Sequence, residues 1–223
     1  MNEKPLHAAL KEWYAQPGDR FEVSVDGFVV DLVRDDLLIE VQTRNFAAIR
    51  DKLIVLVTRH PVRLVCPIPS QKWIVRLDGN GSGVLGRRRS PRRGVLPDLF
   101  GELVHLPRLI EHPNFSLEVL LTHEEEVRRR DARRGWRRGG LVIHERRLLQ
   151  VVGRHLFKTP QEIAALIPSA LADPFTTGDL AAALGRSPWL AGRMAYCLRE
   201  LGLIVPLGKR GRSLFYERVK SDK

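Results

Sequence analysis

The sequence predicts an α/β protein in which an αβββαβ core is followed by a basic middle region and a smaller α+β domain. Three observations lead to this prediction. Apolar residues recur at helical and then at strand spacing, in the order of that core, through the first 78 residues. Arginine-rich segments then interrupt the apolar pattern, and the C-terminal part returns to short helices and a hairpin. We therefore expect domains at residues 1–78, 79–160 and 161–223.

The core is expected to begin with a helix at residues 6–15, followed by a strand at residues 21–25 that turns at Asp26-Gly27. A helix at residues 45–58 and an apolar strand at residues 62–68 complete it. Such a strand is typical of a buried parallel strand reached by a right-handed crossover. The expected core positions are Leu6, Ala9, Leu10 and Trp13 on the first helix and Phe46, Ile49, Leu53, Leu56 and Val57 on the second.

Two short apolar runs flank the turn Asp35-Asp36 and are predicted to pair as a hairpin. With a two-residue loop, Asp31 lies directly opposite Glu40, and Gln42 shares their face of the sheet. Two carboxylates opposed at about 5 Å repel each other. A divalent cation bound between them would remove the repulsion, because hard cations prefer oxygen ligands.

The alternative is an edge hairpin whose polar outer face is solvated. Val29, Val33 and Leu38 share the face of the two carboxylates, and the neighbouring segments are apolar as well. Apolar neighbours favour a partly buried site over a solvated surface. We therefore prefer the metal site.

Asp31, eight intervening residues and then Glu40-Val41-Gln42 resemble the catalytic core of the PD-(D/E)xK nuclease superfamily. The αβββαβ order is similar to that family's restriction-endonuclease-like fold, over roughly residues 1–78. The resemblance implies that Asp31 and Glu40 bind Mg²⁺, or Mn²⁺ in its place, with the Val41 carbonyl as a third oxygen ligand. The family's Lys, which positions the attacking water, is Gln42 here and would act by hydrogen bonding.

The first helix and the first strand of this family contribute further acids, and Glu12 and Glu22 occupy those places. For each of them we favour a surface carboxylate over a ligand. Of the two, we choose Glu22 as the candidate, because it stands on the strand beside the site.

The net charge of +11 is unevenly placed along the chain. Residues 1–78 contain 11 basic and 11 acidic side chains, so the remainder, with 26 basic and 15 acidic, carries the whole excess. A strongly basic C-terminal part favours a polyanionic partner. Attachment to ribosomes or to a membrane surface would give a similar charge. The motifs favour DNA, and RNA stays open.

The middle region offers two candidate DNA contacts. After glycine-rich turns at residues 78–86, a run of arginines is either a clamp on phosphates or a solvated loop. Its members are Arg87, Arg88, Arg89, Arg92 and Arg93. Between strands at residues 116–121 and 141–152, a segment too polar for the core is either an arm on DNA, with Trp136 stacking on a base, or a flexible loop. Its arginines are Arg128, Arg129, Arg130, Arg133, Arg134, Arg137 and Arg138. A helix is expected at residues 96–110.

The C-terminal domain resembles a winged helix-turn-helix. A capped helix at residues 176–185 ends in glycine, and Ser187-Pro188 opens a second helix with Leu190, Met194, Cys197, Leu198 and Leu201 on its core face. The resemblance implies that the second helix reads DNA through Trp189, Gly192, Arg193, Tyr196 and Arg199. Lys209, Arg210 and Arg212 would form the tip of the wing. The alternative is a module for binding protein.

These features predict a Mg²⁺-dependent DNA endonuclease, structure-specific in repair or recombination, or restriction-like. The alternative is a non-catalytic DNA-binding regulator on an inactive nuclease scaffold, which Gln42 favours. By resemblance the protein is a homodimer. Cys66 and Cys197 lie in apolar segments and are expected to be buried thiols in a reducing compartment. No signal peptide or membrane span is recognised, so we expect a cytoplasmic protein.

Overall fold

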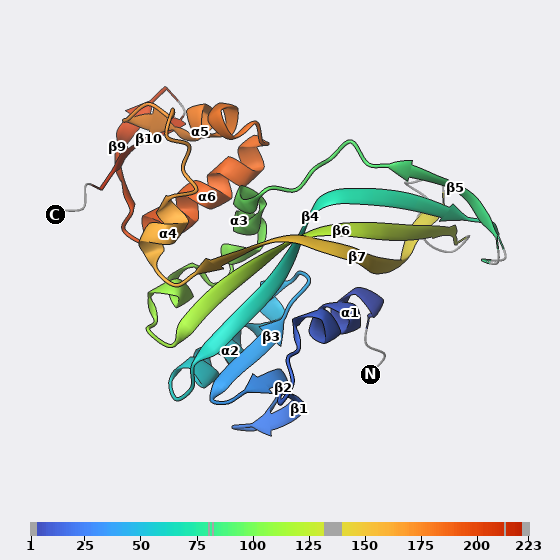
Figure 1. Cartoon of the computed structure of the whole chain (residues 1–223). Coiled ribbons are helices and arrows are strands. Elements are labelled where there is room, and N and C mark those ends of the chain that lie inside the picture. Colours follow the sequence, from blue (N-terminus) through green and yellow to red (C-terminus); the bar gives the residue numbers. More distant parts are fainter. Residues whose placement is uncertain (1–3, 80, 82, 132–139, 212, 220–223) are drawn as a thin grey trace. The chain divides into compact units, whose positions relative to one another are not determined.

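The computed structural model describes residues 4–79, 81, 83–131, 140–211 and 213–219 (Figure 1). The chain forms two compact units, each assembled from three stretches of sequence. The first unit comprises Met1–Thr43, Val65–Val95 and Val119–His155, and the second comprises Arg44–Leu64, Leu96–Glu118 and Leu156–Lys223. The predicted boundaries at residues 78 and 160 stay a prediction.

The first unit begins with helix α1, Pro5–Tyr14, and continues with strands β1, Arg20–Val25, β2, Phe28–Arg34, and β3, Leu37–Val41. Among the described residues the larger sheet has seven strands in the order β1-β2-β3-β4-β6-β7, with β5 paired to β4. The prediction of an α/β protein is therefore confirmed at the level of fold class. The strand expected at residues 62–68 is part of β4, which lies next to β3 in this order.

Two tight turns fix the register of the first three strands. Val25 pairs with Phe28 across Asp26 and Gly27, which both have positive φ, as a two-residue hairpin turn of the I′ type requires. Arg34 pairs with Leu37 across Asp35-Asp36, so the predicted two-residue loop is confirmed. The paired positions of β2 and β3 therefore have the register that brings Asp31 and Glu40 opposite each other.

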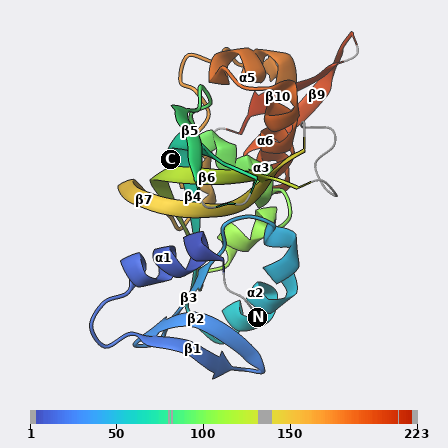
Figure 2. The same ribbon diagram turned by 90° about the vertical axis from the view of Figure 1, so that its right-hand side faces the viewer.

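Helix α1 lies against this part of the sheet (Figure 2). Leu6 and Leu10 are buried as predicted, but Trp13 is 42% exposed and Tyr14 takes the third core position. Leu6, Leu10 and Tyr14 are spaced four residues apart and lie on one side of the helix. They pack in one cluster with Leu32, Ile39, Val41, Val65 and Leu120.

Hydrogen bonds from Arg34 on β2 link the C-terminal end of α1 to the sheet. Arg34 on β2 donates from Nε and Nη2 to the two oxygens of Asp19, at 2.9 and 2.7 Å, and from Nη2 to the carbonyl of Tyr14. Asp19 also accepts the N–H of Gln16. The hydrogen bonds from Arg34 hold the pKa of Asp19 below its usual range, although burial acts in the opposite direction. Because the guanidinium and the carboxylate are joined by two hydrogen bonds, the pair fixes the orientation of the two groups as well as their contact.

The remaining strands of the larger sheet, most of whose residues belong to the first unit, are β4, Val62–Leu77, β5, Val84–Arg89, β6, Phe115–Arg130, and β7, Leu141–Phe157. In Figure 1, β4, β6 and β7 run side by side, and β5 flanks the far end of β4. β4 and β6 extend well beyond their predicted ends at residues 68 and 121. β7 also exceeds its predicted length.

The prediction that residues 124–140 are too polar for the interior is wrong at the start of this segment. Glu124, Glu126 and Val127 are buried on β6. Lys72 on β4 donates to Glu126 at 2.8 Å, and Arg128 donates to the same carboxylate. The hydroxyl of Thr122 donates to Glu124 at 2.7 Å. Buried carboxylates are tolerated when such partners replace water.

The second unit contains η1, Phe46–Ile49, and α2, Arg50–Val57, in place of one continuous predicted helix. Phe46, Leu53, Leu56 and Val57 are buried as expected. The predicted helix at residues 96–110 is wrong as a single element. It is divided into η2, Leu96–Leu99, α3, Phe100–Leu103, and η3, Pro107–Glu111. Pro107 lacks an N–H and disfavours helical backbone at the preceding residue, so it ends α3 and begins η3.

The C-terminal part of the second unit contains α4, Pro160–Ala164, β8, Phe175–Thr176, α5, Thr177–Leu184, and α6, Pro188–Glu200. Strands β9, Ile204–Arg210, and β10, Ser213–Arg218, follow, in a sheet of order β8-β10-β9. The predicted caps are confirmed: Thr176 and Asp179 form a capping box, Gly185 ends α5 with φ +60°, and Ser187 caps α6. The core face of α6 is buried as predicted.

Two further expectations can be compared with the structure. Cys66 and Cys197 are buried free thiols, as predicted, and burial raises the pKa of Cys197 to about 12. Among the helices of the described residues, none is long and apolar enough to cross a membrane.

Candidate active site

The candidate site lies where the pairing of β2 with β3 ends. The ladder runs from Arg34 and Leu37 to Leu32 and Ile39. One residue further, side chains accept the backbone hydrogen bonds. The N–H of Asp31 donates to Oε1 of Glu40 at 3.3 Å, and the N–H of Val41 donates to Oδ2 of Asp31 at 2.9 Å. The two predicted metal ligands are therefore held beside each other at the opening between the strands.

Glu22 on β1 is a third acid beside Asp31 and Glu40. We call Glu22, Asp31 and Glu40 together the acidic row. Phe21 pairs with Leu32 and Val23 pairs with Val30, so Glu22 occupies the position across from Asp31. Its φ is +51°, which L-residues other than Asn and Asp rarely adopt and which costs about 1 kcal/mol. A strained residue inside a strand is a recognised indication of a functional site. The predicted preference for Glu22 has a geometric basis, because Glu22 adjoins Asp31.

Two side chains of α1 reach the row from above the sheet. His7 Nε2 lies 3.3 Å from Oδ2 of Asp31. Lys11 Nζ lies 3.0 Å from Oε1 of Glu22 and 4.0 Å from Oδ1 of Asp31. His7 and Lys11 are one helical turn apart, so the same face of the helix presents both. Sequence analysis missed them, although their i, i+4 spacing beside the apolar stripe was a usable signal.

The surroundings of Asp31 favour its ionised form. Burial alone would raise the pKa of Asp31, but the hydrogen bonds from His7 and the Val41 N–H, together with the charge of Lys11, bring this pKa below its usual value. Glu40 is 5% exposed, and the Lys11 side chain is 6% exposed. The Glu22 side chain is 65% exposed, so the row leads from the interior to the surface.

The chemical type of these groups fits a hard divalent cation in part. Asp31 and Glu40 supply adjacent carboxylate oxygens, which Mg²⁺ and Mn²⁺ prefer. Within the described residues there is no group of three or more His, Cys, Asp or Glu side chains placed to hold a metal ion. A metal at this site would therefore depend on the two carboxylates and on backbone or water oxygens.

Val41 and Gln42 continue the strand beyond the carboxylates. The N–H of Gln42 donates to the carbonyl of Val65 on β4 at 2.8 Å, so the backbone at the third motif position is fixed. The side chain of Gln42 is partly exposed. Glu12 on α1 is exposed, as a surface carboxylate would be.

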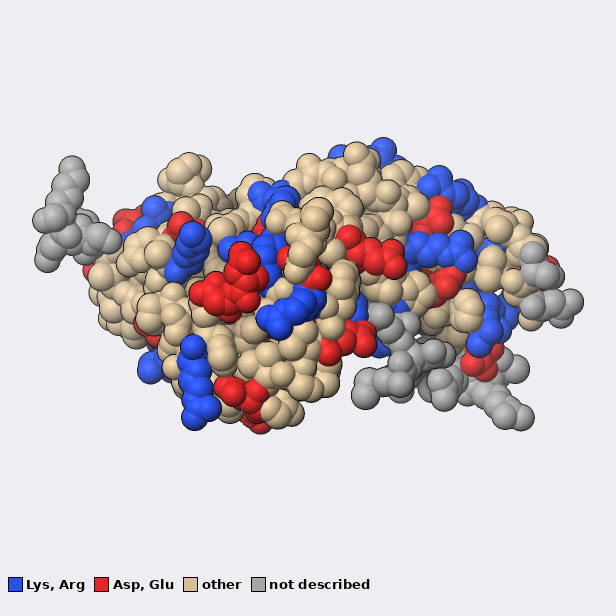
Figure 3. Space-filling model, turned by 60° about the horizontal axis from the view of Figure 1, so that its bottom comes forward, with Lys and Arg blue, Asp and Glu red and all other residues tan. Residues whose placement is uncertain are grey.

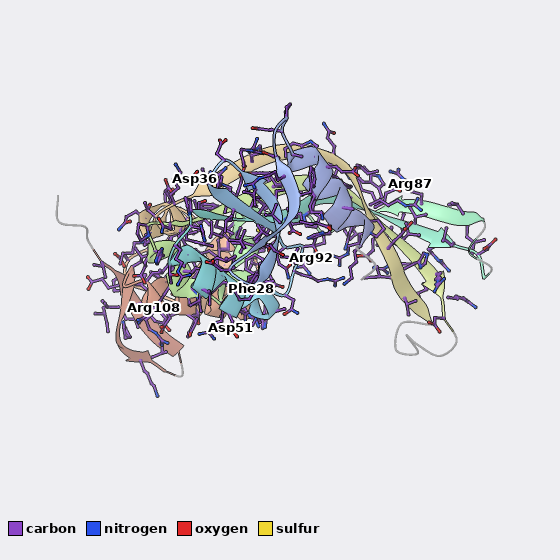
Figure 4. All side chains as sticks on the ribbon, turned by 90° about the horizontal axis from the view of Figure 1, so that it is seen from below. Phe28, Asp36, Asp51, Arg87, Arg92 and Arg108 are labelled. Atoms are coloured by element: carbon purple, nitrogen blue, oxygen red, sulfur yellow. The ribbon has the colours of Figure 1, made fainter. Side chains whose placement is uncertain are left out.

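The arginine run that was predicted as a clamp is divided into two parts. Arg87, Arg88 and Arg89 are solvated on the strand β5 rather than in a loop, and the clamp stays a prediction: β5 pairs with β4 from Leu77 and Val84 to Trp73 and Arg89. All six residues of β5 are exposed. Figure 4 shows Arg87 on this strand and Arg92 well apart from it.

Arg92 and Arg93 stand in a turn that is anchored at both ends. The N–H of Ser90 donates to the carbonyl of Lys72 at 2.7 Å, and the N–H of Gly94 donates to the carbonyl of Pro69 at 2.9 Å. A side chain at Gly94 would bring its Cβ within 2.7 Å of Pro69 O, so only glycine fits this close approach. The backbone that carries the exposed Arg92 and Arg93 is therefore held in a defined position.

The outward face of α6 is partly engaged inside the second unit. Arg193 donates to the carbonyl of Gly101 and lies over the Trp189 ring, 4.2 Å from its centroid. Trp189 is 60% exposed. Tyr196 lines a cavity of about 570 Å³ with α2 and η3 residues, and Arg199 lies over its ring. Gly192 faces open space. The α6 residues that were predicted to contact DNA are therefore not all free to enter a DNA groove.

The remaining predicted contacts lie at the ends of hairpins. Lys209 is exposed on β9, and Arg210 ends that strand. Arg212 lies outside the described residues, as do Arg133, Arg134, Arg137, Arg138 and Trp136. Arg128, Arg129 and Arg130 end β6. On the face shown in Figure 3, basic and acidic side chains are interspersed, so this face carries no patch of a single sign.

Comparison with known proteins gives one family and one relative. A family model described as a domain of unknown function (DUF8091) matches residues 4–158, which include α1, the acidic row and β5. An uncharacterized protein of Treponema pallidum (strain Nichols) is 30% identical over 223 residues, covering 97% of this chain and 85% of the relative. No solved structure matches the chain.

Proposed function

Because the chain belongs to the DUF8091 family, whose description states no activity, we propose a function from the geometry alone: metal-dependent hydrolysis of phosphodiester bonds in DNA. The N-terminal elements α1 to β4 would be a nuclease core similar to that of the PD-(D/E)xK superfamily. Their order and the sheet order β1-β2-β3-β4 support this proposal.

One observation carries the proposal. Asp31 and Glu40 replace backbone ladder bonds with side-chain bonds at the point where β2 and β3 separate. A fold that needed only stability would continue the ladder with apolar residues here, because burying carboxylates is costly. The hydrogen bonds from His7 and the Val41 N–H, with the charge of Lys11, lower the pKa of Asp31 against the effect of burial and so favour the ionised state that a metal ligand requires.

In this proposal Asp31 and Glu40 would hold one divalent ion, with the Val41 carbonyl available as a further oxygen. The ion would supply Lewis-acid stabilisation of the charge that develops on the phosphate. A water oxygen forms a new P–O bond while the ester P–O bond to the leaving nucleotide breaks. Gln42 orients that water by a hydrogen bond. The Gln42 amide cannot accept the proton that the attacking water loses. This proton passes to a phosphate oxygen of the substrate, and solvent protonates the leaving oxygen.

DNA binding is proposed for two basic elements. In the first unit, the exposed arginines of β5 and of the turn after it can contact phosphates in succession. In the second unit, α4, β8, α5, α6, β9 and β10 follow the order of a winged helix-turn-helix, and the sheet order β8-β10-β9 supports that assignment. The wing around Lys209 is the part of this unit that we propose for phosphate contact.

A second candidate is a non-catalytic DNA-binding regulator. It is favoured by the groups already placed beside Asp31, since the Lys11 ammonium offsets part of the acidic charge without a metal and His7 Nε2 lies 3.3 Å from Oδ2 of Asp31. Gln42 in place of Lys points the same way. We keep RNA as an alternative polyanion to DNA, and we further propose a homodimer and a cytoplasmic location.

Cleavage assays separate the two candidates. Supercoiled plasmid, flap and four-way junction DNA would be incubated with the protein in Mg²⁺, in Mn²⁺ and in EDTA. The nuclease predicts metal-dependent products that EDTA prevents. Binding of all three substrates without any product would favour the regulator.

A further inference from the structure

The acidic row has no lysine on its own strands, because Gln42 occupies the position after Glu40-Val41. A neutral amide can orient a water molecule, but it adds no positive charge beside the phosphate. The structure nevertheless brings one ammonium group to the row. Lys11 comes from α1, an element that the strand motif does not include.

Lys11 is held in place from two directions. Its neighbours Leu6, Leu10 and Tyr14 pack in the core cluster, so the helix cannot rotate without exposing them. Its Nζ is paired with Glu22 at 3.0 Å while the side chain is 6% exposed. A buried ammonium is costly unless paired, and here the partner is an otherwise exposed residue with strained backbone.

The position of Nζ is informative. It lies 4.0 Å from Oδ1 of Asp31, whereas the other oxygen, Oδ2, accepts the Val41 N–H and adjoins His7. A separation of 4.0 Å is too long for a direct hydrogen bond, and one water oxygen can contact both atoms. The ammonium therefore faces the side of Asp31 that is not used by the Val41 N–H.

The formal charges are consistent with this arrangement. Glu22, Asp31 and Glu40 carry three negative charges, and Lys11 offsets one of them when His7 is neutral. The two that remain match a single divalent ion. A second lysine at position 42 would leave an excess of positive charge at a loaded site.

We propose that Lys11 supplies from α1 the positive charge that Gln42 does not supply from β3, and that Glu22 positions Lys11 for this role. The inference rests on the proposed nuclease function. Lys11 holds the attacking water beside Asp31 and stabilises the charge developing on the phosphate. Glu22 acts through Lys11 and is a positioning residue.

The test moves the charge from one element to the other. Lys11→Met removes the ammonium, Lys11→Gln removes its charge and keeps a donor for Glu22, and Lys11→Arg keeps the charge. The double variant Lys11→Met/Gln42→Lys places an ammonium on β3 instead. Each full-length protein would be measured for single-turnover cleavage in Mg²⁺, for Mn²⁺ affinity by calorimetry and for its unfolding temperature.

We expect Lys11→Met and Lys11→Gln to lower the cleavage rate by about 10²- to 10³-fold. Mn²⁺ affinity should be unchanged or higher, because a positive charge near the ion has been removed. Lys11→Arg should cleave within about tenfold of the wild type, and the double variant should recover at least about tenfold over Lys11→Met. If Lys11 only stabilised the fold, its replacement would change the unfolding temperature. Lys11→Arg and the double variant would then not show this recovery of the cleavage rate.

The inference is overturned if folded Lys11→Met or Lys11→Gln cleaves at the wild-type rate, or if the double variant cleaves no faster than Lys11→Met. In both cases the proposed nuclease function survives, because the wild type still cuts. A wild type that cuts none of the substrates in either metal overturns the function and the role of Lys11 together.

Discussion

The N–H of Asp31 donates to Oε1 of Glu40 at 3.3 Å, at the first position beyond the last paired residues of β2 and β3. The bond places two acids of different strands side by side and ends the regular ladder. Their juxtaposition follows from the two-residue turn at Asp35-Asp36, which fixes the register. A shift by one residue would move one acid to the opposite face and separate the pair.

Two glutamates on β6 should respond to pH in opposite directions. Burial raises the pKa of Glu124, so its contribution to stability is present at low pH and is lost as the pH rises through the folded-state pKa. We therefore expect Glu124→Gln to raise the unfolding temperature at pH 8 and to change it little at pH 4.

Glu126 is the matched control. Although burial acts to raise it, the pKa of Glu126 is lowered, because Lys72 and Arg128 donate to its carboxylate. Its stabilising contribution is present above the unfolded-state pKa and is lost as the pH falls. Glu126→Gln should lower the unfolding temperature at pH 8. Thermal unfolding of both variants at the two pH values checks the pair, and changes of the same sign would refute the assignment.

Neighbouring arginines on β5 should differ in their effect on DNA binding. Arg87 Nε lies 2.7 Å from Glu125, and its guanidinium lies over Trp73, whereas the Arg88 side chain makes no hydrogen bond or ion pair with any described residue. Arg88→Ala should weaken duplex binding and reduce the slope of log affinity against log salt by about 1. Arg87→Ala should change the slope less. Fluorescence anisotropy at several salt concentrations measures both, and equal slopes for the two variants would contradict the proposal.

The second unit allows a similar separation of binding from stability. Lys209 is exposed at the proposed wing, so Lys209→Glu should weaken duplex binding several-fold without changing the unfolding temperature. Trp189→Ala should lower the unfolding temperature, because the ring packs with Arg193 beside Gly101. If Lys209→Glu binds duplex DNA like the wild type, the C-terminal domain is better assigned to protein contacts.

Gln42→Lys tests the third motif position. The backbone there is fixed by the Val65 carbonyl, so the new ammonium should point along the path of the amide. We expect measurable cleavage with a higher Mg²⁺ requirement, because Lys11 already offsets one negative charge of the row. A Mg²⁺ titration of the cleavage rate gives the result. A folded, DNA-bound Gln42→Lys protein without any activity would show that the amide has a further role.

Local signals made much of the fold predictable. The turn residues at Asp26-Gly27 and Asp35-Asp36 fixed two hairpins, and Thr176 with Asp179 marked the start of α5. These features depend on residues close in sequence. The break at Pro107 was equally local and should have divided the predicted helix.

What could not be predicted depends on packing between residues far apart in the sequence. Lys11 is buried because α1 packs through Tyr14 rather than Trp13, and a helical stripe alone does not decide between these two side chains. Glu124 and Glu126 are interior because Lys72, 54 positions before Glu126, lies on the neighbouring strand. β5 is a strand only because β4 extends to Leu77.

The central claim is that Asp31 and Glu40 support metal-dependent cleavage. Cleavage of plasmid and junction DNA by the wild type, Asp31→Asn and Glu40→Gln in Mg²⁺, with EDTA controls, tests it most directly, and anisotropy reports binding of the same substrates. The account predicts cleavage by the wild type only, with DNA affinity within a few-fold in both variants, because a lost metal ligand affects the transition state and not distant phosphate contacts. Equal cleavage by all three proteins, or none by the wild type, would contradict it.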